Sequence, residues 1–400
     1  MTTERISRTE LALLTLAGAV ITANAYYIHP IISRVAEDFG VSASSIGLVP
    51  ALNQVALAVG IFFLLPLGDR FSNRRLVTLF VAGQFCAIAA MAFAPGFFWF
   101  TAASTLLGFF TIAPYILPAY VSKRVDPAQL GHVTAMLTTG VLMGILLARA
   151  GAGVVGEYLG WRTVYYIAAA LMAVMVIVLP VIMVEEESAE EPGADAGYLN
   201  LLMSIGPIVR QQPEILLSGV IQALNFGLFL ATWLGLALHL TSPGMGYGVD
   251  VLGYLALLGF VNLFSTPRLG KLADRIGARR ARLLFASIQA LGMWLLYPFG
   301  ESVWLLVIPL AIMHVVGPPL DVSGRMLFLS QAPEIRTRLT TVYIVIMFLG
   351  GGLASWMGTS AYQWGGWQAN AMLAVGITSI TVLLSLYGLL RYDLQAGRDA

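Results

Sequence analysis

Five side chains that can carry a charge or a proton lie inside long apolar stretches of the sequence. They are Arg149, Asp321, Arg325, His29 and His314. Ionisable groups are costly in a nonpolar environment, and those that remain there commonly bind ligands or transfer protons. A carboxyl or imidazole group can take up and release a proton, whereas an arginine keeps its charge. These residue types therefore indicate a site that binds a small molecule, a proton or both.

Arg149 is the most unusual of the five because only small residues surround it, in the stretch Ala148-Arg149-Ala150-Gly151-Ala152-Gly153. Small residues allow other backbones to approach closely. Since arginine does not lose its proton, Arg149 cannot be a proton carrier. It can bind an anionic ligand or a carbonyl group, or it can pair with a buried acceptor in a purely structural role. The sequence leaves both interpretations open.

Asp321 is the one acidic residue that lies inside a predicted span and not at its first position, and Arg325 follows it by four positions. This spacing places both side chains on one helix face, where they can form a structural ion pair. Alternatively, Asp321 carries a proton and Arg325 adjusts its affinity for that proton. The imidazoles of His29 and His314 are alternative proton sites, or they are hydrogen-bonded packing residues.

The composition determines which elements hold these residues. The chain has 400 residues, of which 58% are hydrophobic and 11% are charged. A soluble protein has about 25% charged residues, so this chain lacks the polar surface that water requires. Its long apolar runs fit spanning helices of about 20 residues, not the alternating strands of an outer-membrane barrel. We therefore expect an all-α polytopic membrane protein.

The same composition excludes several classes of function. The formal net charge of +1 provides no attraction to nucleic acid. A single cysteine, Cys86, permits neither a disulfide within the chain nor a thiolate metal cluster. The sequence contains no HExxH, GxSxG or P-loop pattern, so we expect no enzyme, no cofactor and no metal. The first apolar run, 11–28, predicts a permanent span and not a cleaved signal peptide.

Apolar runs between charged or Gly/Pro/Asn-rich segments predict twelve spans. We expect them at residues 10–33, 44–67, 76–95, 98–121, 132–156, 162–184, 214–238, 250–268, 281–299, 302–326, 339–362 and 368–391. Arginines and lysines gather on one side. Six of them, from Arg268 to Arg282, are assigned to the loop that joins predicted spans eight and nine, with its edges (268–282), so that side and both termini should be cytoplasmic. A long loop, 185–213, separates an N-terminal six-helix bundle (1–184) from a C-terminal one (214–400).

Two short patterns recur at nearly the same distance, which indicates an internal repeat. Asp69 and Asp274 lie 205 positions apart, each followed by an arginine, and the pairs Gly160-Trp161 and Gly366-Trp367 lie 206 apart. Because this offset holds six spans, both copies enter the membrane in the same sense. We therefore expect two parallel six-helix repeats that rock about a central site.

The pattern Gly270-x-x-x-Asp274-Arg275-x-Gly277-x-Arg279-Arg280 resembles the loop signature of the major facilitator superfamily. The stretch around Asp69 is a weaker copy, with Leu65 and Ser72 where the family has glycine. The segments Tyr26-Tyr27-Ile28-His29-Pro30 and Pro66-Leu67-Gly68-Asp69-Arg70 resemble bacterial drug or metabolite exporters of this superfamily. The resemblance covers the whole chain and implies the major facilitator fold.

The resemblance also implies a conformational latch at one face, in which carboxylates meet arginines and helix ends. Its residues would be Asp69, Arg70, Arg75, Asp274, Arg275, Gly277 and Arg280. Otherwise these charges only anchor the cytoplasmic loops.

Spans one, four, seven and ten line the cavity in this superfamily. The resemblance therefore selects Asn24, Tyr27, His29, Tyr115, Gln222, Asn225 and Asp321 as candidate site residues. Pro114 and Pro118 in span four, with Pro318 and Pro319 in span ten, predict helix breaks at equivalent places.

These features predict a secondary active transporter that works by alternating access. The resemblance favours proton-coupled export of small organic compounds by a monomer in the bacterial inner membrane, with the lipid bilayer, the substrate and protons as partners. One alternative is proton-coupled uptake of a small organic anion, which Arg149 favours. Another is a non-transporting membrane sensor. A passive channel is disfavoured because the sequence contains no ring of repeated charges and no filter-like loop.

Overall fold

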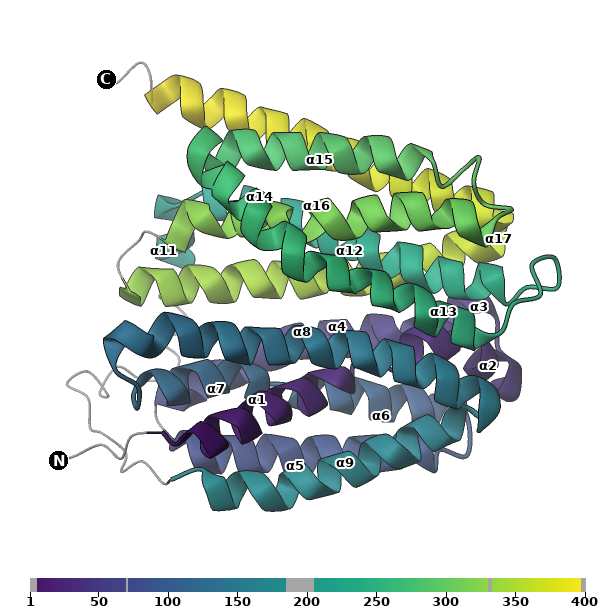
Figure 1. Cartoon of the computed structure of the whole chain (residues 1–400), viewed down its shortest axis with the longest axis horizontal. Helices are drawn as coiled ribbons and strands as arrows, with labels where there is room; N and C mark the ends of the chain where they lie inside the picture. The colour runs from purple at the N-terminus through teal and green to yellow at the C-terminus, as the bar shows by residue number, and fades with distance from the viewer. Residues whose placement is uncertain (1–5, 70, 185–204, 330–332, 397–400) are drawn as a thin grey trace.

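A computed structural model describes residues 6–69, 71–184, 205–329 and 333–396. All regular elements in these residues are helices, as the sequence predicts. Figure 1 shows them running side by side, with the first half of the chain below and the second half above. Helix α1 begins and α17 ends at the same end of the molecule, which we call the termini end. The other end is called the opposite end.

The first half contains nine α-helices and one 3₁₀ helix among its described residues. They are α1 (Arg8–Ala23), α2 (Ile28–Phe39), α3 (Ala43–Ile46), α4 (Leu48–Leu64), η1 (Leu65–Asp69), α5 (Asn73–Ala92), α6 (Phe97–Phe110), α7 (Ala113–Ser122), α8 (Pro127–Tyr158) and α9 (Trp161–Ile182). The described second half contains α11 (Ile205–Gln211), α12 (Glu214–Leu240), α13 (Val249–Ala256), η2 (Leu257–Val261), α14 (Asn262–Ile276), α15 (Ala278–Trp294), α16 (Val303–Leu329) and α17 (Pro333–Ala396).

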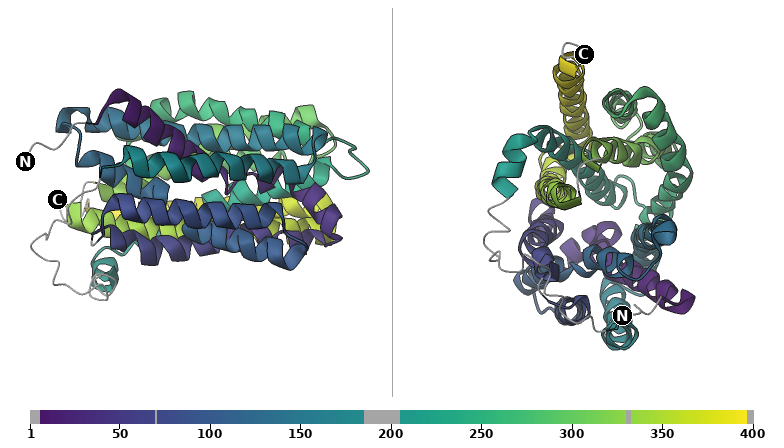
Figure 2. Two further views of the ribbon diagram at one scale, coloured as in Figure 1. Left: turned by 90° about the horizontal axis from the view of Figure 1, so that it is seen from below. Right: turned by 90° about the vertical axis from the view of Figure 1, so that its left-hand side faces the viewer.

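Twelve membrane spans follow from these helices. Ten helical segments of the described chain are long and apolar enough to cross a membrane. The last of them contains two spans, because the backbone of α17 is not helical at Gly365 and Gly366. Helix α15, with 17 residues, adds the remaining span. The two halves therefore hold six spans each, as the predicted fold class requires. Viewed from the termini end, most of these helices are seen nearly end-on (Figure 2, right).

The internal repeat is visible in the backbone. Gly160 and Gly366 both have a positive φ, 85° and 61°, which glycine adopts without strain. Each is followed by a tryptophan that begins the next spanning helix and is buried, Trp161 at 7% exposure and Trp367 at 6%. The two copies of the Gly-Trp pair thus perform the same structural task in both halves.

Prolines interrupt spans one and four. Pro30 has no N–H with which to bond the carbonyl of Tyr26, so that carbonyl accepts from the His29 N–H instead (3.2 Å), and α1 and α2 are separate helices. Pro114 lies in the first turn of α7, and the backbone leaves the helical region just before it, at Thr111 (ψ 47°). The break predicted for span four is therefore present.

The break predicted for span ten is wrong. Helix α16 continues through Pro309, Pro318 and Pro319 without interruption. Proline is tolerated inside a spanning helix where neighbouring groups satisfy the freed backbone carbonyls, so it does not have to end the helix.

The predicted loop 268–282 is also wrong. Helix α14 extends the eighth span to Ile276, α15 begins at Ala278, and only Gly277, at φ 91°, separates them. Arginine, lysine, leucine and alanine favour helix, which explains why this charged stretch is helical. Arg282 does not lie in a loop but is fully buried within α15, where it donates to the Ser218 hydroxyl (3.1 Å).

The predicted central loop, 185–213, is described only in part, because its residues 185–204 lie outside the described residues. The part that the structure describes contains the short helix α11, which precedes α12. The domain boundaries that this loop defines remain a prediction.

At the opposite end, the two halves are joined by polar contacts. The Glu157 carboxylate at the end of α8 accepts from the Val249 N–H at the start of α13 (2.9 Å) and from Arg34 of its own half (3.0 Å). The Ser44 N–H of α3 donates to the side chain of Gln363 in α17 (2.7 Å). These contacts between the halves therefore involve α8 and α3 of the first half, with Arg34 of α2 bonded to the same Glu157.

Close helix packing supports these contacts. Gly153 of α8 faces Gly253 of α13, and a Cβ added to Gly153 would lie 2.7 Å from the Val249 carbonyl oxygen and 2.8 Å from the Gly253 Cα. Small residues thus allow the two halves to approach to backbone contact at this end.

Candidate functional site

Arg149 lies on α8 where the two halves meet. It is nine residues before Tyr158, which corresponds to about 14 Å of helix from the opposite end. Its guanidinium carbon lies 3.8 Å from the centre of the Trp233 ring and 5.0 Å from that of Phe229, and both rings come from α12 of the second half. The cation therefore crosses from one half to the other and rests on two aromatic faces.

Arg149 is buried, and two of its three guanidinium nitrogens lack a hydrogen-bond acceptor among the described residues. The side chain is 2% exposed, and its Nε and Nη1 atoms have no hydrogen-bond partner among the described residues. Cation–π contacts compensate for about 2 kcal/mol of a desolvated charge, which is less than the cost of burying it. The guanidinium can therefore still bind an anion or a carbonyl oxygen.

Both predicted histidines lie near this arginine. Arg149 interacts electrostatically with His29, His314 and Tyr26. The His314 ring contacts both Phe229 and Trp233, with 5.9 Å between ring centres in each case. The His29 ring meets Tyr26 edge-on at 5.2 Å. We call these six residues, Arg149, Trp233, Phe229, His29, His314 and Tyr26, the Arg149 cluster.

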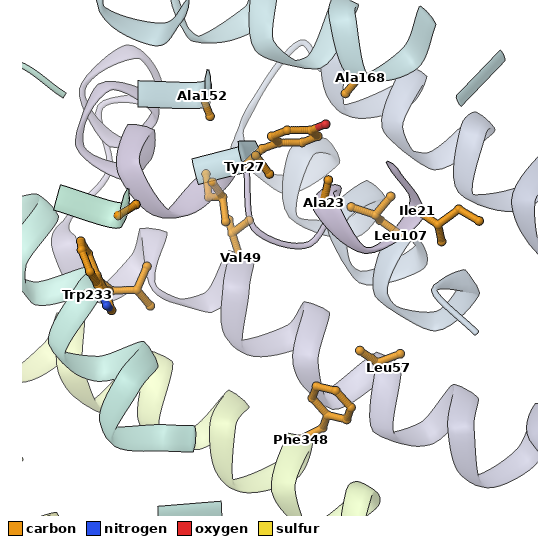
Figure 3. Packing of buried hydrophobic residues seen from close by; sticks show 14 of the residues in the cluster. Ile21, Ala23, Tyr27, Val49, Leu57, Leu107, Ala152, Ala168, Trp233 and Phe348 are labelled. Carbon is orange, nitrogen blue, oxygen red and sulfur yellow. The ribbon is translucent and has the colours of Figure 1, made fainter. Parts of the chain in front are cut away.

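Several polar atoms in and beside the Arg149 cluster share its lack of partners. Within the described chain, the following atoms have no hydrogen-bond partner: the two ring nitrogens of His29, Nε2 of His314, Nε1 of Trp233, and Nδ2 and Oδ1 of Asn24. Native proteins rarely leave such atoms unpaired, so these atoms are available to a ligand or to water molecules. Figure 3 labels Trp233 of the second half in the same buried cluster as Val49 and Ala152 of the first.

Asp321 and Arg325 form the ion pair that their spacing allows. Nε of Arg325 lies 3.0 Å from both carboxylate oxygens, and the Tyr343 hydroxyl donates to Oδ1 (2.8 Å). The two charged side chains are 23% and 29% exposed. In contrast to Arg149, Arg325 already has a carboxylate partner on its own helix.

Gln222 and Asn225 belong to a separate network of amides. Asn225 Nδ2 donates to Gln222 Oε1 (3.1 Å) and to the Gly317 carbonyl of α16 (3.0 Å), while Gln289 Nε2 donates to Asn225 Oδ1 (3.0 Å). This network ties α12, α15 and α16 together inside the second half.

The two predicted tyrosines lie in the first half. Tyr27 is buried at the junction of α1 and α2, in the packed region of Figure 3. The Tyr115 ring at the start of α7 meets Phe348 of α17 edge-on, with 6.3 Å between ring centres. Tyr115 therefore touches the second half. Among the described residues, no hydrogen bond joins Asn24 or Tyr27 to Asp321 or Arg325.

The predicted latch is only partly described. The Asp69 side chain and Arg70 lie outside the described residues. The backbone N–H of Arg75 donates to the Ser72 hydroxyl (3.3 Å), which caps the start of α5. Asp274 and Arg275 are exposed near the end of α14, beside Gly277. Arg280 lies 3.9 Å from Asp393 of α17. The latch therefore remains a prediction.

No group of three or more His, Cys, Asp or Glu side chains within the described ranges could hold a metal ion. The groups brought together suit the binding of a small molecule by hydrogen bonds, charge and aromatic contact.

Sequence reasoning missed Trp233, Phe229, Tyr26, Gln289 and Tyr343. One signal could have identified the first two. Phe229 and Trp233 lie four positions apart in a predicted span, so their rings must share a helix face, where they can meet a buried cation. Gln289 was visible as a polar residue within predicted span nine.

Twelve spans in two parallel halves, with polar groups buried where the halves meet, define a polytopic membrane carrier. The family model of the Major Facilitator Superfamily matches residues 14–317, and the chain belongs to that family. It is thus a transporter and not an enzyme.

Curated relatives resemble nearly the whole chain. The chain is 29% identical to "Uncharacterized transporter YgaY" of Escherichia coli O157:H7, with 96% of each chain covered. It is 30% identical to "Probable transporter SCO4007" of Streptomyces coelicolor, over 94% of this chain and 88% of the relative. It is 23% identical to "Multidrug resistance protein MdtG" of Citrobacter koseri, over 94% and 93%.

Two solved structures share the fold. The nucleoside transporter NupG superposes with a TM-score of 0.75 at 14% identity, covering 94% of this chain and 99% of that one. A bacterial homolog to the human lysosomal transporter Spinster, in an inward-facing and unoccupied conformation, gives 0.76 at 14% identity, covering 94% and 95%.

Proposed function

We propose that this transporter exports small organic compounds across the bacterial inner membrane in exchange for protons, by alternating access. The main support is that the two halves contact each other at the opposite end, through hydrogen bonds of Glu157 and Ser44 and the close packing of Gly153 on Gly253. A carrier closed at one end loads its substrate from the other. Multidrug resistance protein MdtG, a relative over most of the chain, supports the export direction.

We infer that the termini end faces the cytoplasm. Arginines and lysines of the described chain gather there, including Lys123, Lys271, Arg275 and Arg280, and positive residues favour the cytoplasmic side. In this orientation the closed opposite end is the outer face. The structure would then represent a state that receives substrate from the cytoplasm, and the protein would act as a monomer in the lipid bilayer.

Asp321 is the proposed proton carrier. It is a carboxyl group within a spanning helix, only partly exposed, and its negative charge is shared with Arg325 and Tyr343. Protonation of Asp321 would release Arg325, and deprotonation would restore the pair. This local change in charge gives proton binding a means to alter the packing of α16 against α17.

The test is transport in proteoliposomes whose cytoplasmic face points outward and whose lumen is acidic. Radiolabelled organic anions, cations and neutral compounds are offered outside. Exchange with protons predicts accumulation of substrate against its gradient. Asp321→Asn should abolish this accumulation while retaining counterflow between equal substrate pools. Asp38→Asn is the control, because it removes a carboxylate from the surface ion pair with Arg162.

Flux that does not respond to the pH gradient would contradict proton coupling. Accumulation only when the external side is acidic would instead favour proton-coupled uptake. That second candidate, uptake of an organic anion, draws its support from the unpartnered guanidinium of Arg149.

A further inference from the structure

We propose that the Arg149 cluster binds the oxyanion group of the substrate, so that the transported compounds are organic anions with an aromatic or apolar body. This inference rests on the proposed transport function and specifies its substrate class. It is carried by a buried cation, Arg149, whose surroundings among the described residues provide hydrogen-bond donors and aromatic rings but no negative charge.

Arg149, Arg282 and Arg325 lie inside spanning helices and differ in their partners. Arg325 is paired with Asp321. Arg282 donates from Nη1 to Ser218 and interacts with the Glu214 carboxylate, although its Nε and Nη2 have no hydrogen-bond partner in the described chain. Arg149 has no hydrogen-bond acceptor for Nε or Nη1 and no interacting carboxylate among the described residues. A buried charge is normally paired, so we expect the Arg149 guanidinium to bind an anion that is not part of the chain.

The atoms that surround the guanidinium include hydrogen-bond donors. His29 is 1% exposed and His314 is 4% exposed, and each neutral imidazole can donate to an anion from one ring nitrogen, as can Nε1 of Trp233. A carboxylate has about four lone-pair sites and a phosphonate has more, enough to satisfy several of these donors at once. A ligand cation would be repelled by Arg149, and a neutral ligand would leave the charge uncompensated.

Aromatic rings of the Arg149 cluster can contact the remainder of the substrate. Phe229, Trp233 and Tyr26 supply flat apolar surface directly beside the cation and the histidines. Aromatic faces favour apolar or aromatic ligands, and two of these rings already contact the guanidinium. The combination suits a compound with an oxyanion at one end and a ring or chain at the other.

The position of the cluster makes the binding relevant to transport. Arg149, His29 and Tyr26 belong to the first half, whereas Trp233, Phe229 and His314 belong to the second. An anion held here contacts both halves, so their relative movement would change its set of ligands. Such a site gives the substrate different affinities in the two states, which population shift by a ligand requires.

The experiment measures binding to the purified full chain in detergent, where neither a gradient nor vesicles are needed. The probes are benzoate, phenylphosphonate and benzenesulfonate, with neutral benzamide and cationic benzylamine for comparison. Stabilisation against thermal unfolding reports binding, because a ligand that binds only the folded state raises the midpoint. We expect at least one of the anions to raise the midpoint, and benzamide and benzylamine to have no effect.

Arg149→Met should weaken binding of the active anion by more than about tenfold, since a charge-assisted pair is lost. Arg149→Lys keeps the charge but loses the planar fork of donors, so it should bind the anion less tightly and still prefer it to benzamide. If Arg149→Met does not fold, Arg149→Lys supplies the test. Arg282→Met is the matched control: it removes a buried arginine outside the cluster and should leave anion binding unchanged.

The proposal is overturned if none of the three anions stabilises the wild type, if benzamide or benzylamine stabilises it equally, or if both Arg149 variants bind anions like the wild type. These results are separable from failure of the transport proposal. Gradient-driven flux of a neutral compound would leave transport intact while excluding the anion site. Anion binding without gradient-driven flux would retain the site while excluding proton coupling.

Discussion

The two ends of the molecule use their polar residues differently. At the opposite end, Glu157 and Ser44 bond across the interface to residues of the second half. At the termini end, Arg279 bonds to Glu214 (2.7 Å) and Asp393 (2.9 Å), all within the second half. The ion pair of Arg124 with Glu10 (3.9 Å) likewise stays within the first half.

This difference shows which contacts can break during transport and which must persist. Bonds within a half hold six spans together as a rigid unit, whereas bonds between halves belong to one state. The polar bonds between the halves at the opposite end involve exposed or partly buried groups, such as Ser44 with Gln363 and Glu157 with Val249. Their loss therefore costs little, which fits an interface that opens and closes.

The largest expected effect is on the close approach of the helices at the opposite end. Gly153→Val adds side-chain atoms where the Val249 carbonyl and the Gly253 backbone lie within 3 Å. Overpacking of this kind costs about 1–3 kcal/mol or more, and here it acts on the closed state alone. We expect substrate counterflow in proteoliposomes to fall by more than about tenfold, since RT ln 10 is about 1.4 kcal/mol.

Gly151→Val provides the control for this variant. It lies two positions away on the same helix, and a Cβ there would meet nothing within 4 Å. It should transport like the wild type. Equal counterflow in both variants would show that closure at Gly153 is not required.

A smaller effect is expected from the charge that caps α13. Glu157→Ala removes the acceptor for the Val249 N–H and the partner of Arg34. A carboxylate at a helix N-terminus contributes about 1 kcal/mol, so the closed state should lose population by about fivefold. The distance between spin labels at Pro95 and Glu301, both exposed at this end, should lengthen accordingly.

Glu37→Ala is the matched control, because Glu37 also pairs with Arg34 (3.9 Å) but lies within the same helix and does not reach the second half. It should leave the distribution of distances unchanged. An equal shift in both variants would mean that surface charge, and not the cross-half bond, sets the population.

The smallest expected effect is on a contact within one half. Arg279→Gln removes the ion pairs with Glu214 and Asp393, whose side chains are partly exposed, so the free energy of unfolding should fall by about 1 kcal/mol. The label distances at both ends should stay as in the wild type. Arg280→Gln, which removes a 70% exposed side chain, should change neither. A change in opening caused by Arg279→Gln would contradict the view that each half is rigid.

Much of the fold could be predicted from the sequence because lipid imposes a strong rule on composition. Predicted span six, 162–184, corresponds to α9, Trp161–Ile182. The Gly-Trp pairs mark equivalent helix starts, since both glycines adopt a positive φ. The predicted end of span eight was wrong, because residues that lower the hydropathy of a segment can still favour a helix. The arginines after Pro267 lowered the hydropathy of span eight, yet they favour helix, and α14 continues to Ile276.

The candidate site could be predicted only in part. Arg149, His29 and His314 were found because ionisable groups stand out in apolar runs. Trp233 and Phe229 look like ordinary apolar residues in the same runs, and only packing between halves reveals that they meet Arg149. The same limit applies to Asp321, since its spacing from Arg325 allows a pair, whereas the contact with Tyr343 joins two spans far apart in sequence.

The most direct test of alternating access is a pair of distance measurements by electron spin resonance in lipid. With Cys86 replaced by serine, labels are placed at Pro95 and Glu301 at the opposite end, and at Ser122 and Lys271 at the termini end. We predict two populations, in which the longer distance at one end accompanies the shorter distance at the other, and a shift between them on adding substrate. A single population with both distances unchanged by substrate, in a protein that transports, would contradict the account.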